Sequence, residues 1–201
     1  MGEDAQTMRF IQKENVRLKA DNGSLQAYLA RFQQSIKSLT DLQDRLDKIG
    51  PETNVYSLIK QILTITMEAV SSENGTLMLV DEETHELVFV EVIGEARDTL
   101  LHFRLPKGQG IAGWVVENRK ARLVADVRKD PQFSAKVDGI TGYQTHSVIC
   151  VPLVDGQRSI GAVEVINTSS GRPFSEADRD ILQLVARLAS VAIVLAEKET
   201  A

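Results

Sequence analysis

A heptad repeat of apolar residues near the N-terminus constrains this 201-residue chain more than any other feature. With Met8 at position a, every d position up to residue 46 is apolar, and the 3-4 spacing runs without interruption. Such a narrow seam is typical of a coiled coil, whereas a helix packed on its own domain usually shows a wider apolar stripe. The seam residues expected to pair between two chains are Ile11, Leu18, Leu25, Leu29, Phe32, Ile36, Leu39 and Leu46.

Polar residues in this seam predict how the two helices are oriented. Asn15 and Asn22 occupy consecutive a positions, and Asn at position a favours a parallel two-stranded arrangement because the buried amides can pair across the dimer axis. Gly50-Pro51 then ends the pattern, since proline disrupts a helix interior. We therefore expect a parallel homodimer through a coiled-coil helix at residues 1–50, followed by a globular domain at residues 51–201.

Helical and strand patterns alternate through the rest of the chain. A 3.6-residue period predicts a helix from about Glu52 to Val70, and a last helix begins after Ser175, which forms a capping box with Asp178. Between them we expect an α+β fold. It has a central antiparallel sheet with the terminal helices on one face and a loop and short-helix cover on the other. The expected strands are Gly75–Asp81, Glu86–Ile93, Thr99–Leu105, Ala121–Val127, Ser147–Val154 and Ile160–Ile166, and the short helix is Ile111–Glu117.

Composition excludes several classes of function. The net charge of −5 argues against nucleic acid and anionic membranes as partners, because neither finds a basic surface to attract it. No run of about 18 apolar residues is present, so we expect no membrane span. The single cysteine, Cys150, rules out an intrachain disulfide, argues against a metal cluster, and fits a reducing, cytoplasmic location.

The sequence shows no catalytic pattern. Its three histidines, His85, His102 and His146, have no acid at a fixed short spacing that would complete a triad. The glycines around Gln109 lack the Lys-Ser/Thr of a phosphate-binding loop. Cys150 has apolar neighbours on both sides, which favours a small buried core residue over a covalent cofactor attachment. We therefore predict no enzyme and no catalytic residues.

The polar segment from residue 126 to residue 147 is the candidate binding site. Aromatic, hydroxyl and carboxyl side chains alternate there between two strand patterns, and such a set could stack on and hydrogen-bond a small planar molecule. Three alternatives remain open: Phe133 fills the core as a plug, the carboxylates are only solvated, or Asp126 or Asp130 caps the following helix. The predicted ligand-binding residues are Asp126, Phe133, Asp138, Thr141, Tyr143, Thr145, Ser147 and Glu164.

Four motifs in the globular part resemble those of the GAF domain, a ligand-sensing module of signalling proteins. They are GQGIAGWV, DPQF, TGYQTHSVICVPL and IGAVEVIN, and the resemblance covers residues 55–196. Cyclic-nucleotide-binding members of that family carry an Asn-Lys…Phe…Asp-Glu signature. Asn167, Phe174 and Asp178 match it here, whereas Thr168 replaces the Lys and Arg179 replaces the Glu.

The resemblance implies a non-enzymatic regulatory module. We expect it to bind a small molecule, either a cyclic nucleotide or another ligand, and to pass the signal through the homodimeric coiled coil and the terminal helices. No firm cofactor is expected. The alternative is a GAF domain that binds no ligand and serves as a dimerisation or protein-interaction scaffold.

Overall fold

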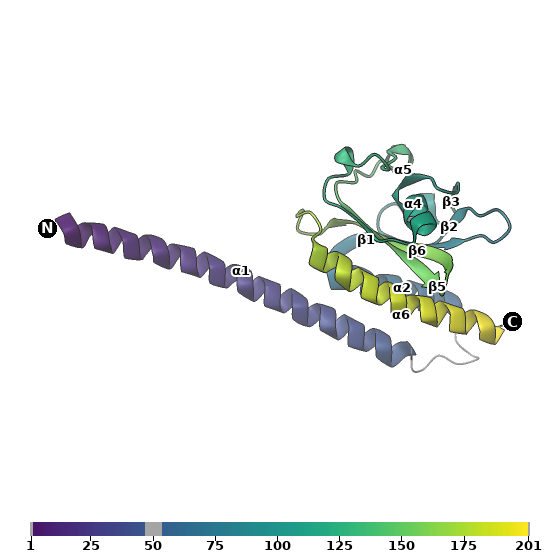
Figure 1. Cartoon of the computed structure of the whole chain (residues 1–201), viewed down its shortest axis with the longest axis horizontal. Helices are drawn as coiled ribbons and strands as arrows, with labels where there is room; N and C mark the ends of the chain where they lie inside the picture. The colour runs from purple at the N-terminus through teal and green to yellow at the C-terminus, as the bar shows by residue number, and fades with distance from the viewer. Residues whose placement is uncertain (1, 47–53, 201) are drawn as a thin grey trace.

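A long N-terminal helix extends away from an α+β domain (Figure 1). The computed structural model describes residues 2–46 and 54–200. Helix α1 (Gly2–Leu46) has 45 residues, and its last turns lie beside two helices of the domain. The helix expected from the heptad pattern is therefore present, while the expected break at Gly50-Pro51 lies outside the described residues. None of the described helices is both long enough and apolar enough to cross a membrane.

Six strands form one antiparallel sheet in the order β3-β2-β1-β6-β5-β4. The two hairpins expected from the sequence, β1 with β2 and β5 with β6, are confirmed, and β1 pairs with β6 to join them at the centre of the sheet. The edge strands are very short, with two residues in β3 and three in β4. The strand bounds are β1 (Ser72–Val80), β2 (Leu87–Ile93), β3 (Arg104–Leu105), β4 (Arg122–Val124), β5 (Val148–Asp155) and β6 (Arg158–Thr168).

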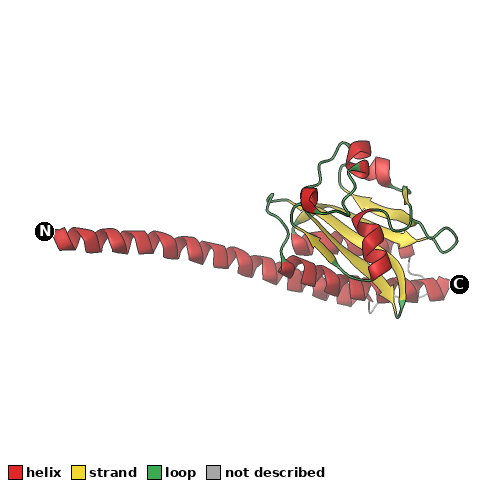
Figure 2. Cartoon of the chain, turned by 45° about the horizontal axis from the view of Figure 1, so that its top comes forward, coloured by secondary structure: helices red, strands yellow, loops and turns green. Residues whose placement is uncertain are grey.

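Helices cover both faces of this sheet, so the α+β fold is confirmed (Figure 2). Alternate side chains of each strand point to opposite faces, and two apolar clusters result. Leu77 and Val163 pack against α2 (Val55–Val70) and α6 (Glu176–Thr200), while their neighbours Met78 and Ala162 face the other side. That other side carries α3 (Arg97–Leu100), α4 (Gly110–Asn118), the 3-10 helix η1 (Val127–Lys129) and α5 (Lys136–Thr141).

Local side-chain caps position the two terminal helices of the domain. Asn54 begins α2, because its side-chain oxygen accepts a hydrogen bond of 3.0 Å from the Ser57 amide. The capping box expected at the start of α6 is confirmed: the Ser175 amide donates to the Asp178 carboxylate (2.8 Å), and the Asp178 amide donates to the Ser175 hydroxyl (3.4 Å).

The segment expected to be a strand at Thr99–Leu105 is wrong for most of its length. Only Arg104–Leu105 pair with β2, and α3 takes up the first part. His102 adopts a left-handed backbone (φ 67°), which ends an extended run, and the turn buries Leu100 in the apolar cluster beside Phe89. The strand expected at Ala121–Val127 is likewise shorter, because Asp126 caps η1 and ends it.

The centre of the sheet leaves no room for a side chain at Gly161. A Cβ atom added there would lie 2.1 Å from the Met78 carbonyl oxygen of the neighbouring strand. We expect Gly161→Ala to destabilise the domain by about 2 kcal/mol or more, because backbone must shift to relieve the overlap. That loss corresponds to a fall in melting temperature of at least about 4 °C by differential scanning calorimetry.

Gly139→Ala is the matched control for this substitution. A Cβ atom at Gly139 meets nothing within 4 Å, so the melting temperature should stay within about 1 °C of the wild type. Equal melting temperatures for the two variants would contradict the close approach of β1 and β6.

Candidate functional site

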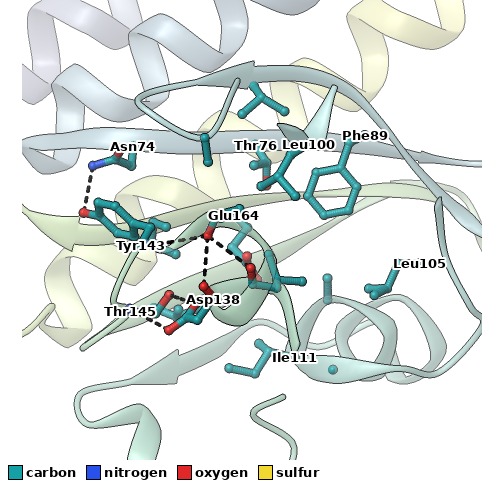
Figure 3. Close-up of a pocket in the computed structure, with 18 of the residues that line it drawn as sticks. Asn74, Thr76, Phe89, Leu100, Leu105, Ile111, Asp138, Tyr143, Thr145 and Glu164 are labelled. Atoms are coloured by element: carbon teal, nitrogen blue, oxygen red, sulfur yellow. Dashed lines mark hydrogen bonds between the residues drawn. The ribbon is translucent and has the colours of Figure 1, made fainter. Parts of the chain in front are cut away.

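A pocket lies between the cover side of the sheet and the helices above it (Figure 3). It encloses about 900 Å³ of atom-free space, which includes its opening to solvent. Its walls come from β1, β2, β5 and β6, from α3 and the first turn of α4, and from residues 133–145 of the segment that crosses over the sheet. We call residues 126–147 the cover segment.

Most of the residues predicted to bind a ligand line this pocket. The cover segment contributes five and β6 contributes one; these are Phe133, Asp138, Thr141, Tyr143, Thr145 and Glu164. Asp126 does not line it, because its carboxylate caps η1 and pairs with Arg128 (2.9 Å). That arrangement lowers the pKa of Asp126 to about 2, chiefly through the Arg128 hydrogen bond. Ser147 is buried at the start of β5, outside the lining.

Sequence analysis missed the side of the pocket built by the first hairpin. Asn74 and Thr76 of β1 line it together with Phe89 of β2. The available signal was the alternation of side chains within each strand. It places Thr76 on the same face as Met78 in β1, and Glu164 on the same face as Ala162 in β6. Without the pairing of β1 with β6, that alternation did not say that the two polar residues meet.

Hydrogen bonds within the cover segment hold its carboxyl and hydroxyl groups in place. The Asp138 carboxylate accepts from the Thr145 amide (2.8 Å) and from the Thr145 hydroxyl (2.7 Å). The Thr141 hydroxyl donates to the Val137 carbonyl (3.1 Å) and accepts from the Tyr143 amide (3.2 Å). The polar side chains of this wall are therefore ordered by the segment itself.

Asn167 fastens the cover segment to the sheet. It has a left-handed backbone (φ 52°) at the end of β6, and its side-chain oxygen accepts from the amides of His146 (2.8 Å) and Ser147 (3.1 Å). Its side-chain nitrogen donates to the Tyr143 hydroxyl (3.1 Å). The same hydroxyl accepts from the Asn74 side chain (2.9 Å), so Tyr143 ties the cover segment to the start of β1.

The floor of the pocket carries an unusual carboxyl group, that of Glu164. In the sheet Glu164 lies directly between Thr76 of β1 and Cys150 of β5. Burial raises the pKa of Glu164 from 4.5 to about 7, and the nearby Asp138 carboxylate adds to the rise. Cys150 is fully buried beneath, as the sequence predicted, and burial raises the pKa of its thiol well above the ordinary value.

An ion pair stands close to the positions that match the cyclic-nucleotide signature. Arg172 donates to both carboxylate oxygens of Asp178 (2.7 and 3.0 Å). Burial opposes ionisation of Asp178, but the Arg172 guanidinium holds the pKa of this carboxyl below its ordinary value. The Thr168 hydroxyl donates to the Arg172 carbonyl (2.6 Å). Arginine from the loop thus replaces the lysine that the resemblance expects at Thr168.

Histidine and acidic side chains are the usual candidates for catalysis and metal binding. His85, His102 and His146 are exposed, and none of them lines the pocket. Within residues 2–46 and 54–200 there is no group of three or more His, Cys, Asp or Glu side chains that could hold a metal ion.

The antiparallel six-stranded sheet carries the terminal helices α2 and α6 on one face and the pocket on the other. The GAF domain family model matches residues 52–194, and the chain belongs to this family. Among curated proteins it is 30% identical over 155 residues to dual 3',5'-cyclic-AMP and -GMP phosphodiesterase 11A of Takifugu rubripes. That match covers 72% of this chain and 17% of the relative. The chain spans less than a fifth of the length of the curated relatives it matches.

Solved structures show the same fold at low sequence identity. The GAF domain of a phosphoenolpyruvate-protein phosphotransferase from Coxiella burnetii superposes with a TM-score of 0.71 at 17% identity, covering 83% of this chain and 96% of that one. Free methionine-R-sulfoxide reductase from Neisseria meningitidis, in complex with its substrate, gives 0.68 at 22% identity, covering 82% and 90%. The fold is therefore shared with the GAF domain of a phosphotransferase and with a free methionine-R-sulfoxide reductase.

Removing the Tyr143 hydroxyl should loosen the cover segment. Tyr143→Phe deletes the group that accepts hydrogen bonds from Asn74 and Asn167, at a cost of about 1–2 kcal/mol. Amide hydrogen exchange should become several-fold faster in residues 134–147 while β5 and β6 keep their protection. Tyr56→Phe is the control, because Tyr56 is 73% exposed on α2; equal exchange in both variants would contradict the fastening role of Tyr143.

The raised pKa of Glu164 should appear in the pH dependence of stability. A folded pKa of about 7 against an ordinary 4.5 means that the folded state holds the proton more tightly. The contribution is thus fully present below about pH 4.5 and lost as pH rises to about 7. The free energy of unfolding of the wild type should fall by about 1–3 kcal/mol over this interval relative to Glu164→Gln.

Urea unfolding of both proteins at matched pH values measures this difference, and contributions from all other titrating groups cancel between them. Parallel curves for wild type and Glu164→Gln would show that Glu164 is solvated and carries no raised pKa.

Proposed function

We propose that this chain is a non-enzymatic sensor module of a cytosolic signalling protein, which binds a small molecule in the GAF pocket. The observation that carries the proposal is the pocket itself: apolar walls, with a few polar groups converging from β1, β6 and the cover segment. Small-molecule sites in proteins commonly have this composition. The pocket lies at a segment held to the sheet by side-chain hydrogen bonds, so an occupant can change how firmly that segment is held.

Association of two copies through α1 would give the sensor its output. Seven apolar side chains of the seam are exposed on α1 in the single chain, each by between 47% and 62%. They are Met8, Ile11, Leu18, Leu25, Leu29, Phe32 and Ile36. An apolar seam of this kind is stable in water only when a partner covers it. A parallel second copy is the partner that the heptad spacing and the Asn residues favour.

The outer face of α6 supports the same assembly. Leu184, Val191 and Leu195 are 46–56% exposed there, and their spacing of seven and four residues continues a helical stripe. Because the last turns of α1 lie beside α2 and α6, one continuous helical surface can carry the dimer contact from α1 onto the domain.

A chain of hydrogen bonds links the pocket to the helices that would carry the signal. Tyr143 reaches Asn74, and the Ser72 hydroxyl donates toward the carbonyl groups of Asn74 (2.9 Å) and Asn167 (2.9 Å). Ser72 directly follows Ser71, the residue that ends α2. Movement of the cover segment would therefore shift the junction between α2 and β1. This shift would transmit a signal if the ligand binds two states of the dimer with unequal affinity.

Cyclic nucleotides are one candidate ligand, because a relative is named as a cyclic-AMP and -GMP phosphodiesterase. The second candidate function is the ligandless dimerisation scaffold. The exposed seam supports both functions equally, whereas the pocket and the unsatisfied Thr76 hydroxyl on its floor favour sensing.

Polar substitutions in the seam should separate the two copies. Leu25→Glu with Phe32→Glu places charges at two d positions, so we expect a monomer by light scattering in place of the wild-type dimer. Phe10→Glu with Val16→Glu is the matched control, because both residues are at least 68% exposed but lie off the seam. A dimer mass for the first variant would show that the domain helices alone drive association.

A ligand screen should distinguish sensor from scaffold. We expect at least one compound from a set of cyclic nucleotides, amino acids, amines and 2-oxo acids to raise the melting temperature by more than about 2 °C, since a ligand that binds only the folded state stabilises it. Phe133→Ala, which removes a pocket wall, should abolish the shift, whereas Ile140→Ala on the exposed side of α5 should keep it. The absence of any shift would favour the scaffold.

A further inference from the structure

The pocket floor brings two polar side chains together on neighbouring strands. Thr76 of β1 is the direct partner of Glu164 in β6, and paired residues of an antiparallel sheet point to the same face. Both line the pocket, as Figure 3 shows. A molecule in the pocket would meet a hydroxyl and a carboxyl group side by side.

The Thr76 hydroxyl has no hydrogen-bond partner. Thr76 is 8% exposed, and its Oγ1 atom is buried and unsatisfied. A buried polar atom without a partner costs free energy, and a hydrogen-bond donor on a ligand would remove that cost. Thr76 also lines the pocket, so a ligand there would lie beside this side chain.

The charge of the pocket has one sign. Asp138 and Glu164 both line it, and none of its lining residues, all of which the structure describes, is Lys, Arg or His. An anion placed beside these carboxylates would be repelled, whereas a cation would be attracted and would restore the ionised form that burial disfavours. The raised pKa of Glu164 is consistent with a missing positive partner.

We infer that the pocket takes a primary amine or amidinium cation on a compact apolar body, with the nitrogen donating to the Glu164 carboxylate and to the Thr76 hydroxyl. The inference rests on the proposed sensing function and narrows it to one class of ligand. An ammonium group suits this place because it offers three donors and no acceptor. Asp138 lies across the pocket and adds negative potential.

The rest of the lining suits the apolar body. Residues from β1, β2, β3, α3 and α4 present apolar side chains; they are Met78, Phe89, Val92, Leu100, Leu105 and Ile111. An aromatic ring or a branched alkyl group would be dehydrated there, and aromatic rings can also face the cation.

One feature of the pocket favours the opposite charge. The first turn of α4, from Gly110 to Ala112, also lines it, and the amides at a helix N-terminus attract anions. The Asp138 carboxylate, together with Glu164 once a cation favours its ionised form, outweighs this helix end, which carries only about half a charge. The test therefore includes an anion of matched shape.

Benzylamine, benzyl alcohol and benzoate form a suitable probe set, because they share one ring and differ in the charge of the head group. Binding to the wild-type chain is measured by ligand-observed NMR titration at about neutral pH. We expect benzylamine to bind at least about tenfold more tightly than benzyl alcohol, and benzoate to bind more weakly than either. Competition by the tightest compound of the metabolite screen confirms that the probe occupies the same pocket.

Two variants of equal net charge separate a local contact from long-range attraction. Glu164→Gln should lower the affinity for benzylamine at least about fivefold and should keep the affinity for benzyl alcohol within about twofold of the wild-type value. Glu68→Gln, on the exposed face of α2, removes the same charge outside the pocket. It should leave the affinities for both benzylamine and benzyl alcohol unchanged. Equal losses of benzylamine binding in both variants would overturn the contact with Glu164.

Thr76→Val tests the hydroxyl with a side chain of the same shape. Because the hydroxyl is unsatisfied, the unliganded variant should be as thermally stable as the wild type or more so. Benzylamine should nevertheless bind about threefold more weakly. Unchanged binding would remove Thr76 from the site, whereas a large loss of stability would show that its hydroxyl has a structural role.

The pH dependence of benzylamine binding gives an independent check. Benzylamine stays cationic while Glu164 ionises, so its affinity should rise between about pH 6 and about pH 8 in the wild type and stay flat in Glu164→Gln. The other titratable side chains that face Glu164 are Asp138 of α5, Cys150 of β5 and Tyr143, and none of them is altered in this comparison.

The results distinguish failure of this inference from failure of the sensing function. If benzoate or a cyclic nucleotide binds the pocket more tightly than benzylamine, sensing stands and the amine inference falls. If no probe and no member of the metabolite set binds, both fail, and the scaffold function remains.

Discussion

The side chain of Asn167 is the interaction on which this domain's architecture most depends. Its side-chain oxygen accepts hydrogen bonds from the His146 and Ser147 amides, and its side-chain nitrogen donates to the Tyr143 hydroxyl. These bonds fix the position of the cover segment on the sheet. The cover segment forms no strand of its own across the pocket, and without such a fastening its polar backbone would be free to move in water. The shape of the pocket therefore depends on Asn167, a residue with a left-handed backbone at the end of β6, as well as on the residues that line it.

The sheet beneath is built in the opposite way, from apolar contacts on both faces. Alternate residues of β1 and β6 separate the contacts to α2 and α6 from those to the cover side. The side of the sheet that packs on α2 and α6 is held by close apolar contacts and resists rearrangement. The cover segment is held by hydrogen bonds, which it can exchange for others at a modest cost in free energy. A domain of this kind can respond to an occupant without unfolding, which suits a regulatory module.

The sequence predicted the parts of this fold that depend on local patterns. Both hairpins follow from apolar runs around short polar turns, and the start of α6 follows from Ser175 and Asp178. The prediction of a strand at Thr99–Leu105 was wrong because the apolar residues at its start belong to a helical turn. No local sequence pattern predicts the left-handed backbone of His102. In the same way Phe133, Asp138 and Tyr143 could be selected for the site because they stand in a polar segment, whereas Thr76 could not. Its importance comes from Glu164, which is 88 residues further along the chain and meets it only through strand pairing.

The short edge strands have a consequence for how copies of this domain can meet. An open edge of a sheet presents unpaired amides and carbonyls that invite another strand, and this is a common route to aggregation. Here β3 and β4 offer only two and three residues at the two edges, too little for a stable extension of the sheet by a second molecule. Edge-to-edge growth is thereby suppressed. In the proposed dimer, contact between copies would rest on side chains of helices, where shape and charge set the register and the contact can form and break reversibly.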